Sequence, residues 1–166
     1  MSIVDTLLPE FDQEMAATRR VLERAPEAAF SWRPHEKSFT LGELCTHLSQ
    51  IPNWGVSVLS KDGYDLVRDA GPRAQAKTTV ADVLATFDGF VSQARARLVG
   101  MTDGELRAIW SLARDGHTLM SLPRSAAFKS FAINHLIHHR GQLTVYLRLQ
   151  NVPLPPVYGP TADESL

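Results

Sequence analysis

The chain reads PRSAAFKSFAINHLIHHRGQLTVYLRLQ from Pro123 to Gln150, and this stretch decides the fold. Apolar and histidine positions recur along it at steps of three or four residues, from Phe128 to Leu149. Such spacing is typical of one buried face of a long α-helix. The helix is expected to end at Asn151, because the Pro-rich segment that follows it cannot continue a helix.

Three further segments carry the same helical period, and they cover about residues 3–25, 40–60 and 79–99. The second opens with Thr40-Leu-Gly-Glu43, a capping box in which a hydroxyl and a carboxylate satisfy the first backbone N–H groups of a helix. Gly100 can cap the end of the third. Four long amphipathic helices predict an all-α fold class, a four-helix bundle.

Two connections in the expected bundle are informative. Residues 61–77 are long enough to return along the whole bundle, so that the second and third helices are expected to be parallel. Residues 109–122 contain the turn signal Asp115-Gly116 between short apolar pieces and predict a small hairpin. We expect residues 1–166 to form one domain that ends in an extended Pro-rich C-terminal tail.

The composition argues against several classes of protein. Lys plus Arg number 17 and Asp plus Glu number 18, so the net charge of −1 offers no attraction to nucleic acid or anionic lipid. No apolar run approaches the roughly 18 residues of a membrane span, and the first residues do not resemble a signal peptide. With Cys45 as its one cysteine, the chain fits a reducing compartment. We therefore expect a cytoplasmic protein without nucleic-acid or membrane partners.

Histidine is the residue type that carries the candidate chemistry. His135 and His139 lie one turn apart on the last helix, about 40° apart around its axis, so their rings can converge on one point. Neutral imidazole is a good ligand for zinc, nickel, copper or iron. A core histidine bonded to a backbone carbonyl is the alternative for each ring, and the spacing alone leaves both interpretations open.

The other candidates are weaker. His47 occupies an inward position on the second helix, and Glu43, one turn before it, either orients its ring or serves only in the capping box. Cys45 is expected to face away from His47 as a packed residue. His138 is the main competitor: it can pair with His135 three positions before it, but it lies about 100° from His139 around the helix and is expected to point toward a flank. His35 and His117 are interpreted as solvated or locally bonded. Aromatic residues expected to line a pocket are Trp54, Phe128 and Tyr146.

Three stretches resemble a known family. Residues 32–44, which read WRPHEKSFTLGEL and are followed by His47, resemble the early part of the DinB family of metalloenzymes. Residues 134–143, which read NHLIHHRGQL, resemble its last helix, and residues 152–160 are similar to its ending. The resemblance therefore covers essentially the whole chain.

The resemblance implies a four-helix bundle of up-down-down-up topology that holds a divalent metal ion. Zinc or nickel is the expected ion, with iron or manganese as alternatives. Carried over position by position, the metal ligands fall on His47, His135 and His139. The family resemblance also implies a homodimer.

For function, the resemblance implies a metal-dependent enzyme that acts on small molecules. A thiol-dependent S-transferase is the first expectation, with a low-molecular-weight thiol such as bacillithiol or mycothiol as its partner. A metal-dependent hydrolase is one alternative, and a non-enzymatic metal- or ligand-binding bundle is another. Beyond the three candidate ligands, the sequence identifies no catalytic residue.

Overall fold

The computed structural model describes residues 1–72 and 75–165. Its long helices are α1 (Ile3–Leu22), α2 (Leu41–Ser60) and α3 (Val80–Val99). The last helical segment consists of α5 (Arg124–Phe128), a π-helical turn (Lys129–Asn134) and α6 (His135–Leu149). The short elements are a 3₁₀ turn (Glu27–Ala29), α4 (Asp103–Arg107) and the strands β1 (Gly63–Asp65), β2 (Ile109–Arg114) and β3 (His117–Pro123).

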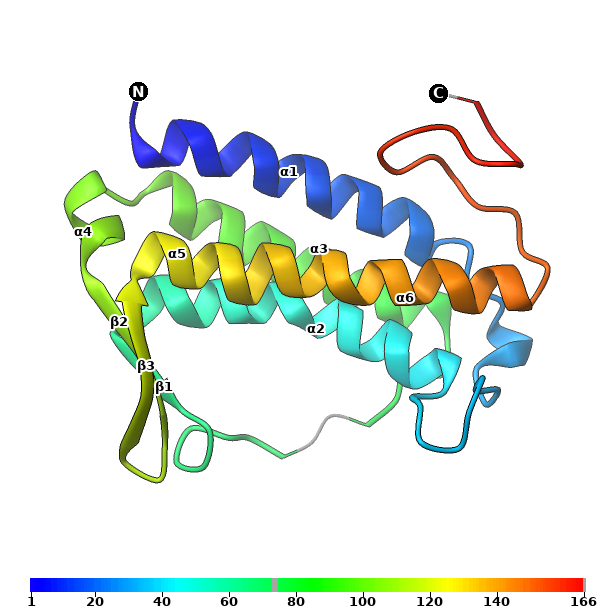
Figure 1. Ribbon diagram of the computed structural model, residues 1–166, viewed down its shortest axis with the longest axis horizontal. Helices are drawn as coiled ribbons and strands as arrows, with labels where there is room; N and C mark the ends of the chain where they lie inside the picture. The colour runs from blue at the N-terminus through cyan, green and yellow to red at the C-terminus, as the bar shows by residue number, and fades with distance from the viewer. Residues whose placement is uncertain (73–74, 166) are drawn as a thin grey trace.

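The long helices lie side by side around one hydrophobic core (Figure 1). The α1 helix and the α5–α6 segment run in one direction, whereas α2 and α3 run in the other. Both α1 and α2 pack against α3 and against α6. Within residues 1–72 and 75–165, none of the helices has the length and apolar character that crossing a membrane requires.

Side-chain caps set where the helices begin. The Thr40 hydroxyl accepts a hydrogen bond from the Glu43 N–H, and the Glu43 carboxylate accepts one from the Thr40 N–H, which confirms the predicted capping box. Thr79 caps α3 in a similar way, and Gly100 follows its last residue. Pro52 is buried within α2, which continues through it.

A three-stranded mixed sheet shows that the all-α prediction is wrong. Strands β2 and β3 form the expected hairpin, whose turn residues Asp115 and Gly116 have φ values of 48° and 82°. Strand β1 pairs in parallel with β2, with Gly63 opposite Ser111. The fold is therefore mainly helical with a small sheet. The sequence did not predict β1, because three residues inside a long connection show no alternation.

The sheet is fastened to one end of the bundle. The Asp65 carboxylate accepts hydrogen bonds from the N–H groups of Asp115 and Gly116, so it holds β1 against the hairpin turn. These backbone N–H bonds, the one from Gly116 above all, keep the pKa of Asp65 well below its usual range. Trp110 on β2 is fully buried and packs against Phe131 in the last helical segment. The hairpin therefore extends from the bundle beside α2.

The C-terminal tail is held by a buried ion pair. Arg140 of α6 and Glu14 of α1 are 2% and 7% exposed, and their Nη2 and Oε2 atoms lie 2.7 Å apart. The Tyr158 hydroxyl donates to Glu14 Oε2 at 2.9 Å and accepts from Arg140 Nη2 at 2.7 Å. Arg140 also donates to the Thr18 hydroxyl. One charged pair thus joins α1, α6 and the tail.

Replacing Arg140 by Ala is expected to destabilise the fold strongly, because it leaves the Glu14 carboxylate buried without its partner. We expect a loss of about 3–5 kcal/mol in the free energy of unfolding, measured by urea denaturation. Arg95→Ala is the control, since Arg95 and Asp12 form an ion pair with side chains 49% and 39% exposed. It should cost less than about 1 kcal/mol. Equal losses in the two variants would contradict this account.

Candidate metal centre

Three histidine side chains converge between two packed helices. His47 comes from α2, and His135 and His139 come from successive turns of α6. The Nε2 atom of His135 lies 3.2 Å from Nε2 of His47 and 3.0 Å from Nε2 of His139. The three candidate ligand atoms all lie within 4.8 Å of one another. The structure thus brings together the three residues that the sequence and its family resemblance singled out.

Hydrogen bonds on the far side of two rings orient them. His139 Nδ1 lies 2.8 Å from Gln142 Oε1, an acceptor, so the proton of this ring is on Nδ1. The Phe131 backbone acts on the pKa of His135 as a hydrogen-bond acceptor does. Because Nε2 of His135 faces the other histidines, Nδ1 is the nitrogen available to the Phe131 carbonyl. Both Nε2 atoms therefore present lone pairs to the centre.

The π-helical turn before His135 explains why the Phe131 carbonyl is within reach. In a regular α-helix that carbonyl would accept from the backbone N–H of His135. Here the N–H of His135 bonds instead to the carbonyl of Ser130, five residues back. The wider turn lets the imidazole use the Phe131 carbonyl, and π-helical turns are frequent at functional sites.

Burial keeps the three imidazoles neutral. Burial and, to a smaller extent, the neighbouring His139 and His135 together lower the pKa of His47 to about 4. Burial is also the main cause that lowers the pKa of His135 and of His139. The hydrogen bonds to Phe131 and Gln142 act in the opposite direction on these two rings, but they are weaker than the effect of burial. Neutral imidazole is the form that binds metal ions.

The geometry fits a divalent cation. Two Nε2 lone pairs that face each other at 3.0 Å repel unless a positive charge lies between them. A tetrahedral zinc ion with Zn–N bonds of about 2.0–2.1 Å keeps its nitrogen ligands roughly 3.3 Å apart. The distances from His135 Nε2 to Nε2 of His47 and of His139, 3.2 and 3.0 Å, are close to this value. The three histidines can therefore hold a metal ion and leave at least one coordination position free.

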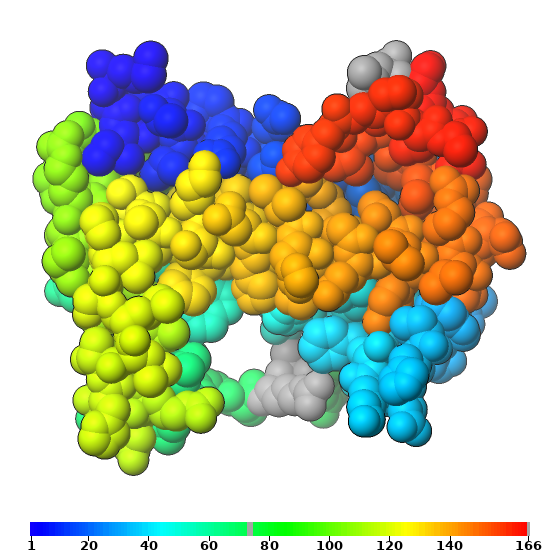
Figure 2. Space-filling model, in the orientation of Figure 1, coloured from blue at the N-terminus to red at the C-terminus, as the bar shows by residue number. Residues whose placement is uncertain are grey.

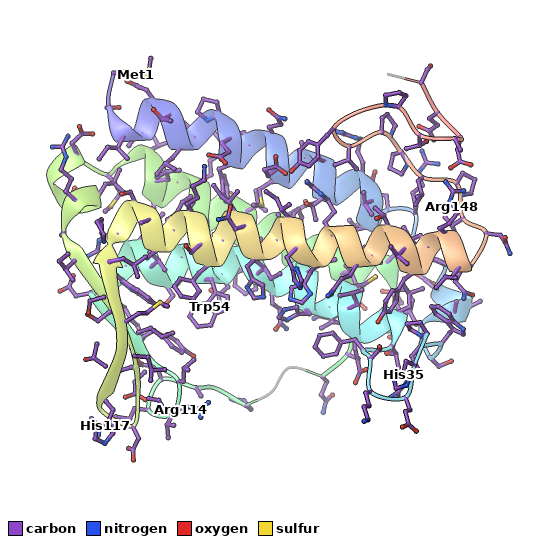
Figure 3. The ribbon with its side chains drawn as sticks, in the orientation of Figure 1. Met1, His35, Trp54, Arg114, His117 and Arg148 are labelled. Atoms are coloured by element: carbon purple, nitrogen blue, oxygen red, sulfur yellow. The ribbon has the colours of Figure 1, made fainter. Side chains whose placement is uncertain are left out.

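A cavity of about 170 Å³ opens beside His47. The described residues that line it are His47, Gln50, Ile51, Asn53, Trp54, Ser57 and Tyr64. Figure 2 shows an opening below α2 and α6, between the hairpin at one end and the residues before α2 at the other. Trp54 lies on the side of α2 from which the hairpin extends (Figure 3). The metal centre is therefore next to space that a small molecule can enter.

Comparison with known proteins agrees with this architecture. The model of the DinB family matches residues 1–165. The chain belongs to the DinB family. The resemblance seen in the sequence motifs is thus confirmed, and it extends over the middle of the chain, where no motif was diagnostic.

Known proteins resemble this protein along nearly its whole length. It is 24% identical over 167 residues to the uncharacterized protein YrdA of Bacillus subtilis (strain 168), covering 97% of this chain and 91% of that protein. The crystal structure of the DinB-like protein YjoA from Bacillus subtilis aligns with a TM-score of 0.70 at 19% identity and covers 92% and 96% of the two chains. A DinB-like protein from Bacillus cereus ATCC 10987 aligns with a TM-score of 0.69 at 22% identity, covering 91% and 95%. These likenesses show the DinB fold.

Two of the weaker histidine candidates of this DinB protein lie away from the centre, whereas the ring of His138 lies 4.8 Å from that of His139 between their centroids. His35 and His117 are exposed at opposite ends of the open side (Figure 3). His138 is exposed on α6, where its Nε2 contacts the Gln142 amide nitrogen at 3.1 Å. Cys45 is fully buried, and burial raises the pKa of its thiol to about 12, so it is a packed residue as expected.

The sequence predicted the surroundings of the centre only in part. Trp54 lines the cavity as predicted, but Phe128 is fully buried in the core, and Tyr146 packs against Trp32. Gln142 lies in the recognised motif, three residues after His139, and its helical spacing was an available signal for its role. The π-helical turn and the contribution of Tyr64 had no such signal.

Replacing His139 by Ala is expected to abolish stoichiometric metal binding, because only two imidazoles remain at the centre. His117→Ala is the control, since this histidine is exposed on β3, outside the centre. Both variants should be purified without a metal column and analysed for bound metal by elemental analysis. Retention of one metal ion by the His139 variant, or its loss from the His117 variant, would refute the assignment.

Metal binding should resist acid. Because the pKa of His47 falls from 6.5 to about 4 in the folded chain, its ring stays neutral over a pH range in which an exposed histidine is protonated. The pKa values of His135 and His139 are lowered in the same direction. Metal uptake should therefore persist to a lower pH than in a histidine-tag peptide, which releases metal near the ordinary pKa of histidine. Equilibrium dialysis at a series of pH values measures this. Half-release at about 6.5, as in the peptide, would contradict the prediction.

Proposed function

We propose that this DinB protein is a divalent-metal-dependent enzyme that transfers a small thiol to an electrophilic substrate. One observation carries the proposal: three neutral imidazoles converge beside a cavity whose described lining contains no charged side chain. Such a centre has room for an exogenous ligand next to the metal ion. A homodimer and a cytoplasmic location stay predictions from the sequence.

The ligand set favours zinc or nickel. Three imidazoles suit these ions and also iron, whereas manganese prefers carboxylate ligands. The described lining of the adjoining cavity offers no carboxylate. A divalent ion held at this centre would lower the pKa of a bound thiol, so that the sulfur becomes a nucleophile at neutral pH.

The residues of the chain support this chemistry in distinct ways. His47, His135 and His139 would hold the ion. Gln142 and the Phe131 carbonyl keep the rings of His139 and His135 turned toward the centre.

The aromatic side chains beside the cavity form its apolar wall. The rings of Trp54 and Tyr64 lie 4.8 Å apart between their centroids, and Trp54 also stacks on Phe131 at 5.6 Å. A wall of this kind excludes water and packs against a flat or apolar substrate.

The proposed reaction is a nucleophilic substitution. The thiol loses its proton to solvent, its sulfur forms a bond to an electrophilic carbon, and the bond between that carbon and the leaving group breaks. The leaving group departs with the electron pair of the broken bond. No oxidant or reductant is required.

Two features favour transfer over the alternatives. A hydrolase benefits from a general base beside the attacking water, and among the described lining residues there is no Asp or Glu to serve as one. A purely structural metal site is closed by a full set of protein ligands. Here three histidines adjoin a cavity that opens to the surface, which is the arrangement expected of a site that exchanges ligands.

Metal-loaded protein should accelerate conjugation of a thiol to 1-chloro-2,4-dinitrobenzene by at least about tenfold over metal-free protein, which corresponds to about 1.4 kcal/mol of barrier. Bacillithiol, mycothiol and glutathione are tested in parallel by absorbance. His139→Ala should lose the acceleration and His117→Ala should keep it. Absence of acceleration with all three thiols would refute the transferase, and metal-dependent turnover of ester or phosphate substrates instead would identify a hydrolase.

A further inference from the structure

The cavity beside the histidines also limits what kind of thiol can bind. We propose that it accepts an extended, uncharged thiol that carries amide groups along its length and a hydroxyl or amide at its far end. This inference rests on the proposed function, since the thiol end must lie at the metal centre. It goes further by naming the chemical class of the molecule attached to the sulfur.

The shape of the cavity requires an extended molecule. His47, Gln50, Trp54 and Ser57 succeed one another at helical spacing along one side of α2. His47 and Ser57 are ten positions apart, which is about 15 Å along a helix that rises 1.5 Å per residue. A cavity of about 170 Å³ spread over that length is a narrow groove with the histidines at one end.

The polar groups that line the groove are uncharged. Gln50 and Asn53 offer side-chain amides, and none of the described lining residues is Asp, Glu, Lys or Arg. Lys61 lies beyond Tyr64, with its Nζ 5.9 Å from the centre of that ring, but it is paired with Asp69. A carboxylate or ammonium group on the ligand would lose its hydration in such a groove and would find no opposite charge among the described lining residues, which is costly. Amide and hydroxyl groups match the lining.

A specific polar group marks the far end of the groove. Ser57 lines the cavity, and its hydroxyl oxygen is buried without a hydrogen-bond partner. Buried hydroxyl groups are nearly always hydrogen-bonded, so an orphaned one beside a cavity points to a partner supplied by a ligand. The serine hydroxyl can both donate and accept, which suits the hydroxyl or amide end of an extended molecule.

The groove preference can be tested by calorimetric titration of three thiols into zinc-loaded protein. Pantetheine is uncharged, extended and ends in a hydroxyl, N-acetylcysteamine has the same thiol end but is too short to reach Ser57, and glutathione is extended but charged. Pantetheine should bind at least about tenfold more tightly than either of the others. The same titrations with metal-free protein measure the contribution of the groove without the metal.

Two serine variants test the far end. Ser57→Ala should weaken pantetheine binding by about three- to tenfold, the value of one hydrogen bond, and leave N-acetylcysteamine binding and metal content unchanged. Ser60→Ala is the control, because Ser60 is exposed on the same helix and bonds to the Val56 carbonyl. It should change neither affinity.

The possible outcomes separate the two proposals. Glutathione binding as tightly as pantetheine, or equal effects of Ser57→Ala on the long and the short thiol, would overturn the groove inference and leave the transferase proposal standing. If zinc-loaded and metal-free protein bind every thiol equally well, thiol binding at the metal centre is refuted instead. In that case, a preference for pantetheine over glutathione in metal-free protein, weakened by Ser57→Ala, would still support an uncharged groove.

Discussion

Three imidazole nitrogens are held close together at the interface between α2 and α6, and the arrangement of the site depends on this constraint. Two of them, on His135 and His139, face each other at 3.0 Å with their protons on the opposite side of each ring. Without a cation, this contact is repulsive and the rings are poorly solvated. The packing of the two helices, the Gln142 amide and the Phe131 carbonyl together maintain the arrangement. A centre that is preorganised in this way spends little energy on ordering its ligands when an ion binds.

The position of the sheet follows from the direction of the helices. Because α2 and α3 run parallel, the chain must return along the bundle between them, and the described residues 61–72 and 75–77 of this return lie below α2 in Figure 1. Strand β1 is part of this return, and its pairing with β2 places Tyr64 beside Trp54. Strand β1 thereby contributes Tyr64 to the lining of the cavity. The same topology that leaves α2 and α3 parallel thus creates the space beside the metal centre.

Much of the helical architecture was readable in the sequence because it depends on local interactions. The capping box at Thr40 and the Asp115-Gly116 turn are each formed by residues close in the chain, so their spacing alone identifies them. The small sheet was not readable, since the pairing of β1 with β2 joins residues about fifty positions apart. The buried pair of Arg140 and Glu14 is likewise long-range, and a charged residue in a helical pattern normally indicates an exposed face.

By itself, the sequence determined that His135 and His139 share one helix face, because the helical period of 3.6 residues places positions four apart on the same side. It also carried the family motifs that pointed to His47. Tertiary structure alone decided that His47 reaches the other two, because that contact depends on how α2 packs against α6. Tertiary structure also decided where the cavity lies, since the described residues that line it come from α2 and from β1. The periodicity of one segment contains no information about which other segment packs against it.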